Sequence, residues 1–112
     1  MAMEVVAPQR GEIWDVNLDP TIGSEIRKTR PCVIVSPDVL NEHWRTVIVA
    51  PLASGAKRFS FRIPSGFEGK RGLIVLDQLK AVDKQRCLRW RGVLDEVTLS
   101  SVLTGLKAMF VP

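Results

Sequence analysis

Alternation of apolar and polar residues along the chain predicts a series of short β-strands. Residues 11–18 alternate, with Trp14, Val16 and Leu18 on one side and more polar positions on the other, which is typical of a strand with one buried face. Residues 32–36 form an apolar run, which favours a central strand covered on both faces. Residues 45–52 predict a third strand, and residues 38–44 between these two strands predict one helical turn or a loop.

The middle of the chain predicts three further strands. Residues 59–63 alternate and place Phe59, Phe61 and Ile63 on one face. Residues 73–82 predict one long apolar strand with two polar residues, Asp77 and Gln78, in its middle, and residues 86–92 predict a further short strand. Proline and glycine predict turns at residues 64–66 and 69–72.

The last segment has helical spacing instead. Asp95 is a suitable N-cap, and the apolar positions that follow are Leu99, Val102, Leu103, Leu106 and Phe110. Gly105 weakens this helix by roughly 1 kcal/mol relative to alanine, so we expect packing to hold it. Many short strands and one terminal helix predict an α+β, mainly β fold: a small, strongly bent sheet or barrel with a helix laid against it.

Composition is that of a globular protein. The chain has 112 residues, 46% of them hydrophobic and 25% charged, and we expect a single domain over residues 1–112 with a flexible start at residues 1–9. No apolar run approaches the roughly 20 residues of a membrane helix, and the start lacks the pattern of a signal peptide. We therefore expect a cytoplasmic protein with no membrane partner.

The sequence offers little for a metal or a disulfide. Cys32 and Cys87 have no CxxC spacing, and His43 is the single histidine. We expect reduced, buried or half-buried thiols, no metal site and no cofactor.

The formal net charge of +4 is compatible with a nucleic-acid partner, but it does not establish one. Most of the basic residues lie in predicted turns, which suits a groove lined with phosphates as well as it suits a solvated surface. The clusters are Arg27, Lys28 and Arg30; Lys57 and Arg58; Lys70 and Arg71; and Lys84, Arg86, Arg89 and Arg91.

A long block of sequence resembles a known family. Residues 10–41 read RGEIWDVNLDPTIGSEIRKTRPCVIVSPDVLN, and further matching motifs are VAPL at 49–52, LDQ at 76–78 and VDKQR at 82–86. These motifs resemble those of the MazF/PemK (Kid-like) toxins of type II toxin–antitoxin systems. The resemblance extends from Arg10 to the final helix.

The resemblance implies an SH3-like (PemK-like) β-barrel with a C-terminal helix, assembled as a homodimer that binds single-stranded RNA along the dimer interface. It implies an endoribonuclease (mRNA interferase) that cuts RNA sequence-selectively without a metal, by attack of the 2′-hydroxyl on the adjacent phosphate. The products would be 2′,3′-cyclic phosphate and 5′-hydroxyl ends. The implied inhibitor is a MazE-like antitoxin whose acidic tail fills the same basic groove.

Three residues are predicted to be catalytic. Arg30 matches the family's catalytic arginine, and a guanidinium is suited to stabilising charge on phosphate oxygens. Where relatives carry a threonine pair after the third strand, this chain has Ala53 and Ser54, so Ser54 must supply the hydroxyl, which requires a bulge or turn. Asp77 matches an acidic position near the RNA site and is predicted either to take part in acid/base chemistry or to read a base edge.

Other residues are predicted to contact RNA. Gln78 is predicted to read bases, while for Glu25 we place loop organisation ahead of a role as base. The remaining candidates, mostly for phosphate contact, are Asn17, Arg27, Lys28, Lys57 and Arg86. His43 falls outside the motif and is assigned to the surface or a dimer edge. Trp14 is predicted to be core, and Trp44 and Trp90 are predicted to pack in the core or an interface or, as the alternative, to stack on bases.

Two alternative functions stay open. Ala53 favours a catalytically weak or inactive module that still binds RNA or antitoxin. Action on DNA gyrase, as in the similarly shaped CcdB toxins, ranks last because the first block of sequence resembles the RNA-cutting branch.

Overall fold

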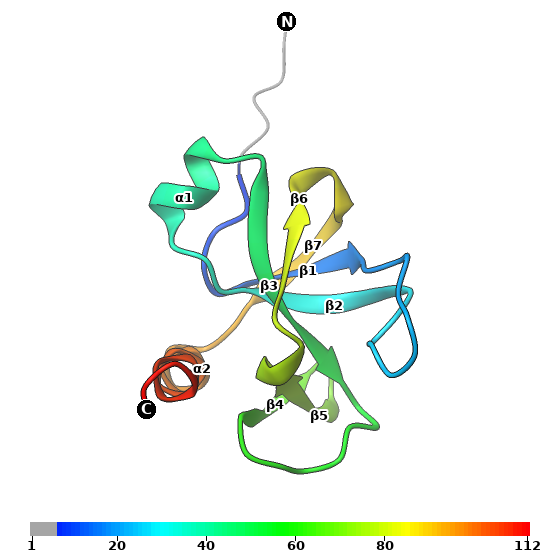
Figure 1. Cartoon of the computed structure of the whole chain (residues 1–112), viewed down its shortest axis with the longest axis vertical. Coiled ribbons are helices and arrows are strands. Elements are labelled where there is room, and N and C mark those ends of the chain that lie inside the picture. Colours follow the sequence, from blue (N-terminus) through cyan, green and yellow to red (C-terminus); the bar gives the residue numbers. More distant parts are fainter. Residues whose placement is uncertain (1–6) are drawn as a thin grey trace, which may run out of the picture.

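The computed structural model describes residues 7–112 (Figure 1). Of the predicted flexible start, residues 1–6 lie outside this range, while Pro8 is buried. The elements in chain order are β1 (Glu12–Asn17), β2 (Thr29–Ile34), α1 (Asp38–His43), β3 (Thr46–Ala53), β4 (Arg62–Phe67), β5 (Lys70–Val75), η1 (Leu76–Gln78), β6 (Lys80–Asp83), η2 (Lys84–Arg86), β7 (Cys87–Val93) and α2 (Glu96–Met109).

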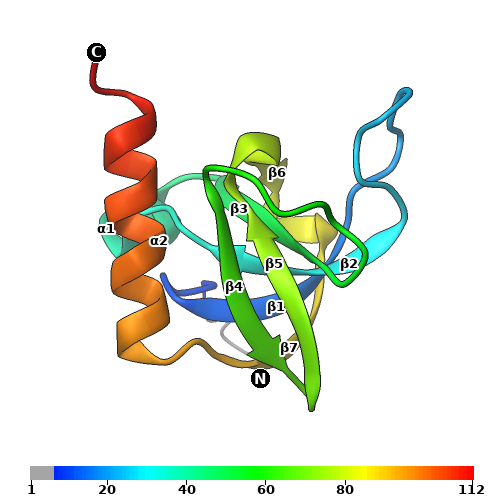
Figure 2. The ribbon, with the colours of Figure 1, turned by 90° about the horizontal axis from the view of Figure 1, so that it is seen from below.

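The strands form one curled antiparallel sheet in the order β4-β5-β3-β2-β1-β7, and β6 pairs with β3 beside this path. Figure 2 shows α2 standing along one side of the sheet, while the β1–β2 loop projects on the opposite side. This half-barrel with its C-terminal helix confirms the predicted mainly-β fold.

Strand β3 holds the two halves of the sheet together. Its first residues, Thr46 to Val49, pair with β6, the residues around Ala50 pair with β2, and its last residues, Leu52 and Ala53, pair with β5. The end of β3 therefore lies where the strand has passed from one set of neighbours to the other. This junction carries the candidate site.

Two hydrophobic clusters lie on the two faces of β2. Val33 and Val35 belong to one cluster, which also contains Val102 of α2, while Cys32 and Ile34 belong to the other. The prediction that this strand is covered on both faces is confirmed. Trp14, which was predicted to be core, is half-buried and packs against the second cluster.

Helix α2 starts as the sequence indicated, and Leu99, Val102 and Leu106 pack in or against the core as predicted. Phe110, predicted to share this apolar face, instead lies past the end of the helix and is 73% exposed. The carboxylate of Asp95 accepts hydrogen bonds from the backbone N–H of Thr98 at 3.0 Å and from its hydroxyl at 2.7 Å, which satisfies the first turn. Gly105 allows the helix to approach closely, since a Cβ there would lie 2.9 Å from Cδ1 of the fully buried Leu76 and 3.5 Å from Cδ1 of Ile63.

The prediction of one long strand over residues 73–82 is wrong. Strand β5 ends at Val75, the chain makes a single 3₁₀ turn through Leu76, Asp77 and Gln78, and β6 then begins on the other part of β3. The turn is closed by the N–H of Leu79, which donates to the carbonyl of Leu76 at 3.1 Å. The polar pair that interrupts the apolar run therefore marks a change of partner strand.

The prediction for residues 59–66 is also wrong. Phe59 is 75% exposed, and Phe61 has a left-handed backbone with φ of 64°, so the chain bends and no strand forms before Arg62. Pro64 and the following residues, predicted to be a turn, lie instead in β4, an edge strand where a missing N–H is tolerated. The turn between β4 and β5 occurs at Glu68 and Gly69, so that β5 includes the predicted turn residues 70–72.

Candidate functional site

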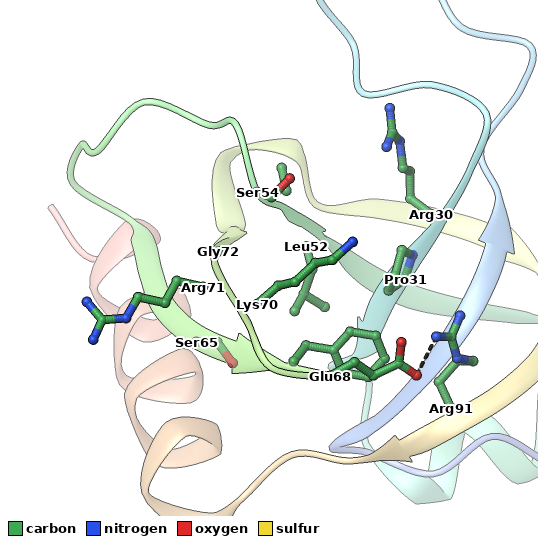
Figure 3. Close-up of a pocket in the computed structure, with 12 residues that line it drawn as sticks. Arg30, Pro31, Leu52, Ser54, Ser65, Glu68, Lys70, Arg71, Gly72 and Arg91 are labelled. Atoms are coloured by element: carbon green, nitrogen blue, oxygen red, sulfur yellow. Dashed lines mark hydrogen bonds and ion pairs between the residues drawn. The ribbon is translucent and has the colours of Figure 1, made fainter.

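Arg30 lies on β2 and is exposed at the surface. Its neighbour Pro31 fixes the local backbone, and its Nε donates to the carbonyl of Arg27 at 3.2 Å. This contact ties the arginine to the β1–β2 loop and leaves its two terminal nitrogens for a ligand. Figure 3 shows the Arg30 side chain extending from β2 at the rim of a pocket, across from Ser54.

Ser54, the hydroxyl predicted to act with Arg30, lies in a turn. Ala53 is the last residue of β3, and a turn begins directly at Ser54 and Gly55. Residues that are adjacent along a strand point to opposite faces of the sheet. Because of this turn, Ala53 and Ser54 nevertheless both line the two pockets that Arg30 lines. Gly72 of β5 brings the backbone close here, since a Cβ at that position would lie 3.2 Å from the carbonyl oxygen of Ala53.

Three open pockets form a groove through this point. Pockets of about 260 Å³ and 460 Å³ share a wall made of Arg30, Ala53 and Ser54. The second pocket continues into a third, of about 420 Å³, which shares Glu25 and Gln78 with it. The structure therefore brings together five predicted site residues, Arg30, Ser54, Glu25, Arg27 and Gln78, around the middle pocket.

Glu25 and Gln78 hold the β1–β2 loop. The Glu25 carboxylate accepts from the N–H of Ile22 at 2.7 Å. The side-chain amide of Gln78 accepts from the N–H of Ile26 at 2.6 Å and donates to the carbonyl of Ser24 at 3.5 Å. These contacts fit the loop-organising role expected for Glu25, and they give Gln78 the same role.

Asn17 and Arg86 contact the backbone where β1 ends. The Arg86 guanidinium donates to the carbonyls of Asn17, at 3.1 Å, and Asp19. The Asn17 side chain accepts from the N–H of Asp19 at 3.1 Å. The N–H of Lys28 donates to the Asp19 carboxylate at 3.1 Å and lowers the pKa of that group. In this structure Asn17 and Arg86 therefore shape the base of the loop rather than line the groove.

Asp77 is held in an ion pair with Arg62. The guanidinium Nε and Nη2 of Arg62 each lie 3.0 Å from one carboxylate oxygen of Asp77, and its Nη1 donates to the carbonyl of Lys57 at 2.8 Å. The guanidinium lowers the pKa of Asp77 below its ordinary value, so the group is ionised at neutral pH. Arg62, which lines the middle pocket, was not predicted from the sequence.

The other predicted phosphate contacts are exposed. Arg27, Lys28 and Lys57 form no ion pair among residues 7–112. Arg27 lines the middle pocket, whereas Lys28 and Lys57 line none of the three pockets of the groove. Lys28 has a left-handed backbone, with φ of 69°.

A second ionic cluster was not predicted. Arg91 of β7 donates to both carboxylate oxygens of Asp15 at 2.9 and 3.0 Å and to the carboxylate of Glu68. Its guanidinium carbon lies 5.2 Å from the ring centroid of Phe67. The cluster ties the β4–β5 turn to β1 and β7. Asp15 and Arg91 are far apart in the sequence, so no local sequence pattern predicts that they pair.

The remaining side chains singled out in the sequence lie outside the groove. His43 and Trp44 are exposed at the end of α1. Trp90 is half exposed, and its indole N–H donates to Glu12 at 3.2 Å.

The two cysteines are free thiols, as predicted. Cys32 is buried and Cys87 half-buried. Burial raises the pKa of both, that of Cys87 to about 11.

Residues 7–112 contain neither a metal-binding cluster nor a helix that could span a membrane. In this part of the chain, there is no group of three or more His, Cys, Asp or Glu side chains that could hold a metal ion. None of its helices has the length and hydrophobicity needed to cross a membrane.

The fold and the site together define a class of protein. A mainly-β half-barrel carries an open groove with an arginine on one strand and a hydroxyl on a neighbouring turn, and further arginines line its walls. The positive charge of these arginines makes the groove suited to an anionic ligand.

Comparisons with known proteins identify the family. Residues 9–110 match the family described as PemK-like, MazF-like toxin of type II toxin–antitoxin system. The chain therefore belongs to this family of toxins, which confirms the resemblance stated from the motifs.

Individual relatives agree with this assignment. The chain is 40% identical over 80 residues to endoribonuclease PemK of Escherichia coli, a match that covers 67% of this chain and 60% of the relative. It is 36% identical over 110 residues to endoribonuclease MazF9 of Mycobacterium tuberculosis, covering 88% and 92%. The crystal structure of MazF from Deinococcus radiodurans has a TM-score of 0.82 at 22% identity, with 94% of this chain and 97% of that one covered. That structure supports the fold.

Proposed function

We propose that the protein is a toxin endoribonuclease that cuts single-stranded RNA sequence-selectively in the cytoplasm. The observation that carries the proposal is the shared wall of Arg30, Ala53 and Ser54 between two pockets of one groove. A strand of RNA laid in the groove would place one phosphate on this wall. The names of the relatives, PemK and MazF9, give the reaction class.

The proposed reaction is transesterification within the RNA. The ribose 2′-hydroxyl loses its proton and attacks the adjacent phosphorus, and the bond from phosphorus to the 5′-oxygen of the next nucleotide breaks as that oxygen takes up a proton. The products are a 2′,3′-cyclic phosphate and a 5′-hydroxyl. Arg30 would stabilise the added negative charge on the phosphate oxygens, and the Ser54 hydroxyl would donate to one of them. This scheme assigns no step to a metal ion.

The proposed partners are a second copy of the chain and a MazE-like antitoxin with an acidic segment. The family description places such toxins in type II toxin–antitoxin systems. A groove lined by Arg27, Arg30 and Arg62 suits an acidic peptide for the same electrostatic reason that it suits RNA. Sedimentation of the purified protein tests the homodimer, and protection of the groove by an acidic antitoxin peptide tests the partner.

A second function is favoured by one observation, the alanine at position 53. If Ser54 cannot replace the missing hydroxyl, the protein is a catalytically inactive module that binds RNA or antitoxin. The two functions differ in whether RNA is cut, not in whether it is bound.

The decisive experiment incubates a long unstructured RNA with the protein in EDTA, beside the Arg30→Ala variant, and analyses the fragment ends. We expect discrete cuts with 5′-hydroxyl ends, and at least about a 100-fold loss of rate in Arg30→Ala, as for other groups that stabilise a transition-state oxyanion. Binding without cutting by the unmodified protein would support the inactive module. Equal cutting by both proteins would remove Arg30 from the site.

A further inference from the structure

The pocket of about 260 Å³ lies on the side of Arg30 away from the β1–β2 loop, between β2 and the β4–β5 hairpin. Apart from the wall of Arg30, Ala53 and Ser54, it contains no residue singled out from the sequence as an individual RNA contact, although Lys70 and Arg71 were noted as a basic cluster. A ligand whose phosphate rests on Arg30 and which extends beyond it in this direction must enter this pocket.

The charges around this pocket single out Lys70. Arg91 shares its guanidinium between two carboxylates, Asp15 and Glu68, so the cluster has a formal charge of −1 and supplies no positive charge to a ligand. Lys70 is exposed and forms no ion pair within the described residues. Figure 3 shows its side chain reaching across Leu52 toward Pro31. The next residue, Arg71, also lines the pocket, but its side chain points away from the others.

The floor of the pocket is apolar and partly aromatic. Leu52 is buried, and Pro31 and Phe67 are half-buried. Phe67 packs against the hydrophobic cluster that contains Val33 and Val102. The Arg91 guanidinium lies over its ring, with the central carbon 5.2 Å from the ring centroid. A fixed aromatic ring beside a lysine is an arrangement that binds single-stranded nucleic acid by stacking a base and pairing a phosphate.

We infer that this pocket is a nucleotide subsite next to the scissile phosphate, in which Lys70 pairs with the adjoining phosphate and Phe67 supports the base. The inference rests on the proposed RNA-cutting function and extends it to residues with no assigned role. The Asp15–Arg91–Glu68 cluster acts here as a positioning device, because it fixes the hairpin that carries both Phe67 and Lys70.

The first test compares two neighbouring cationic side chains, those of Lys70 and Arg71. The RNA segment cut by the unmodified protein is remade with a 2′-O-methyl ribose before the cut, so that it binds without reacting, and its dissociation constant is measured over a range of salt concentrations. The slope of log K against log salt is negative, and loss of one phosphate contact to a single strand reduces its magnitude by about 0.7. We expect this change in Lys70→Gln, no change in the matched control Arg71→Gln, and recovery in Lys70→Arg.

Each other result has a definite meaning. Equal slope changes in Lys70→Gln and Arg71→Gln, or no change in either, would overturn the subsite while leaving the proposed function intact. If the unmodified protein neither binds nor cuts RNA, the proposed function fails and the subsite fails with it. Thermal unfolding of each variant checks that the fold is retained.

The second test examines the base. The fluorescent base 2-aminopurine, whose emission is quenched by stacking, is placed in turn at the two nucleotides beside the cut. We expect quenching at one of the two positions and its relief in Phe67→Leu. Unquenched emission at both positions, or quenching that persists in Phe67→Leu, would overturn the role of Phe67.

Discussion

Arg62 donates hydrogen bonds to both oxygens of the Asp77 carboxylate, each with an N–O distance of 3.0 Å. The same guanidinium donates to the carbonyl of Lys57. One arginine thus joins the 3₁₀ turn after β5 to the loop that follows Ser54. A carboxylate held in this way is an anchor for the loop beside the groove. This geometry differs from that of a free acid or base aimed at a substrate.

The first prediction concerns the pH dependence of cleavage. Arg62 lowers the pKa of Asp77 below its ordinary value of 3.8, so Asp77 stays ionised between about pH 5 and about pH 9 and cannot donate a proton there. We expect Asp77→Asn to reduce cleavage through a looser loop while leaving the shape of the pH–rate profile unchanged. The loss of one limb of that profile in Asp77→Asn would instead identify Asp77 as the acid or base.

The second prediction concerns the hydroxyl at the turn. Because Ser54 lines both pockets beside Arg30, we expect Ser54→Ala to lower the rate of cleavage by about 100-fold, the usual cost of one donor to a developing oxyanion. Adding Ala53→Thr to that variant should restore part of the rate, since a hydroxyl returns to the same wall. An unchanged rate in Ser54→Ala would show that no hydroxyl is needed at this turn.

The third prediction concerns Gly72. A methyl group there would lie 3.2 Å from the Ala53 carbonyl oxygen, a backbone atom that can yield only if the end of β3 moves. A shift of about 1 Å at a site can cost about 100-fold in rate, so we expect Gly72→Ala to lower cleavage by at least about 10-fold. Gly66→Ala on the paired strand is the control, because its methyl group would meet ordinary contacts, 3.9 Å from the carbonyl of Lys70. Equal rates in the two variants would contradict the prediction.

The fourth prediction concerns stability. Gly105→Ala raises helix propensity by about 1 kcal/mol, but its methyl group would lie 2.9 Å from a methyl of the fully buried Leu76. Overpacking of a core costs about 1–3 kcal/mol, so we expect a net loss of about 1 kcal/mol in the free energy of unfolding, measured in urea. Leu76→Val added to Gly105→Ala should relieve the clash. A more stable Gly105→Ala would show that Leu76 moves aside freely.

The regular parts of the fold could be predicted from the sequence. Alternation and apolar runs located β1, β2 and the start of β3, and the spacing after Asp95 located α2, because in each case local residues decide which face is buried. Prediction failed where backbone geometry or a distant partner decides. Phe61 adopts a left-handed backbone that periodicity does not reveal, and the strand expected through Leu76 breaks because its two halves pair with different parts of β3.

In the candidate site, too, residues within local motifs could be predicted and their distant partners could not. Arg30 and Ser54 were predicted from motifs, and the structure places both in the wall shared by two pockets, with the predicted turn at Ser54. The partners that decide what Asp77 and Gln78 do could not be found, because Arg62 is 15 residues from Asp77 and Ile26 is 52 residues from Gln78. Sequence patterns indicate that a polar residue inside an apolar run needs a partner, but they do not say which one.

The pairing of strand β3 makes assembly of the site depend on folding of the whole sheet. Arg30 stands on a strand paired to the middle of β3, while Ser54 follows the end of β3 that is paired to β5. Neither part of the sheet can separate from the other without breaking β3, so unfolding should be a single cooperative event. Arg30 and Ser54 are therefore brought together only in a chain that has completed its folding, and under the proposed function a newly made or partly unfolded copy would not cut RNA.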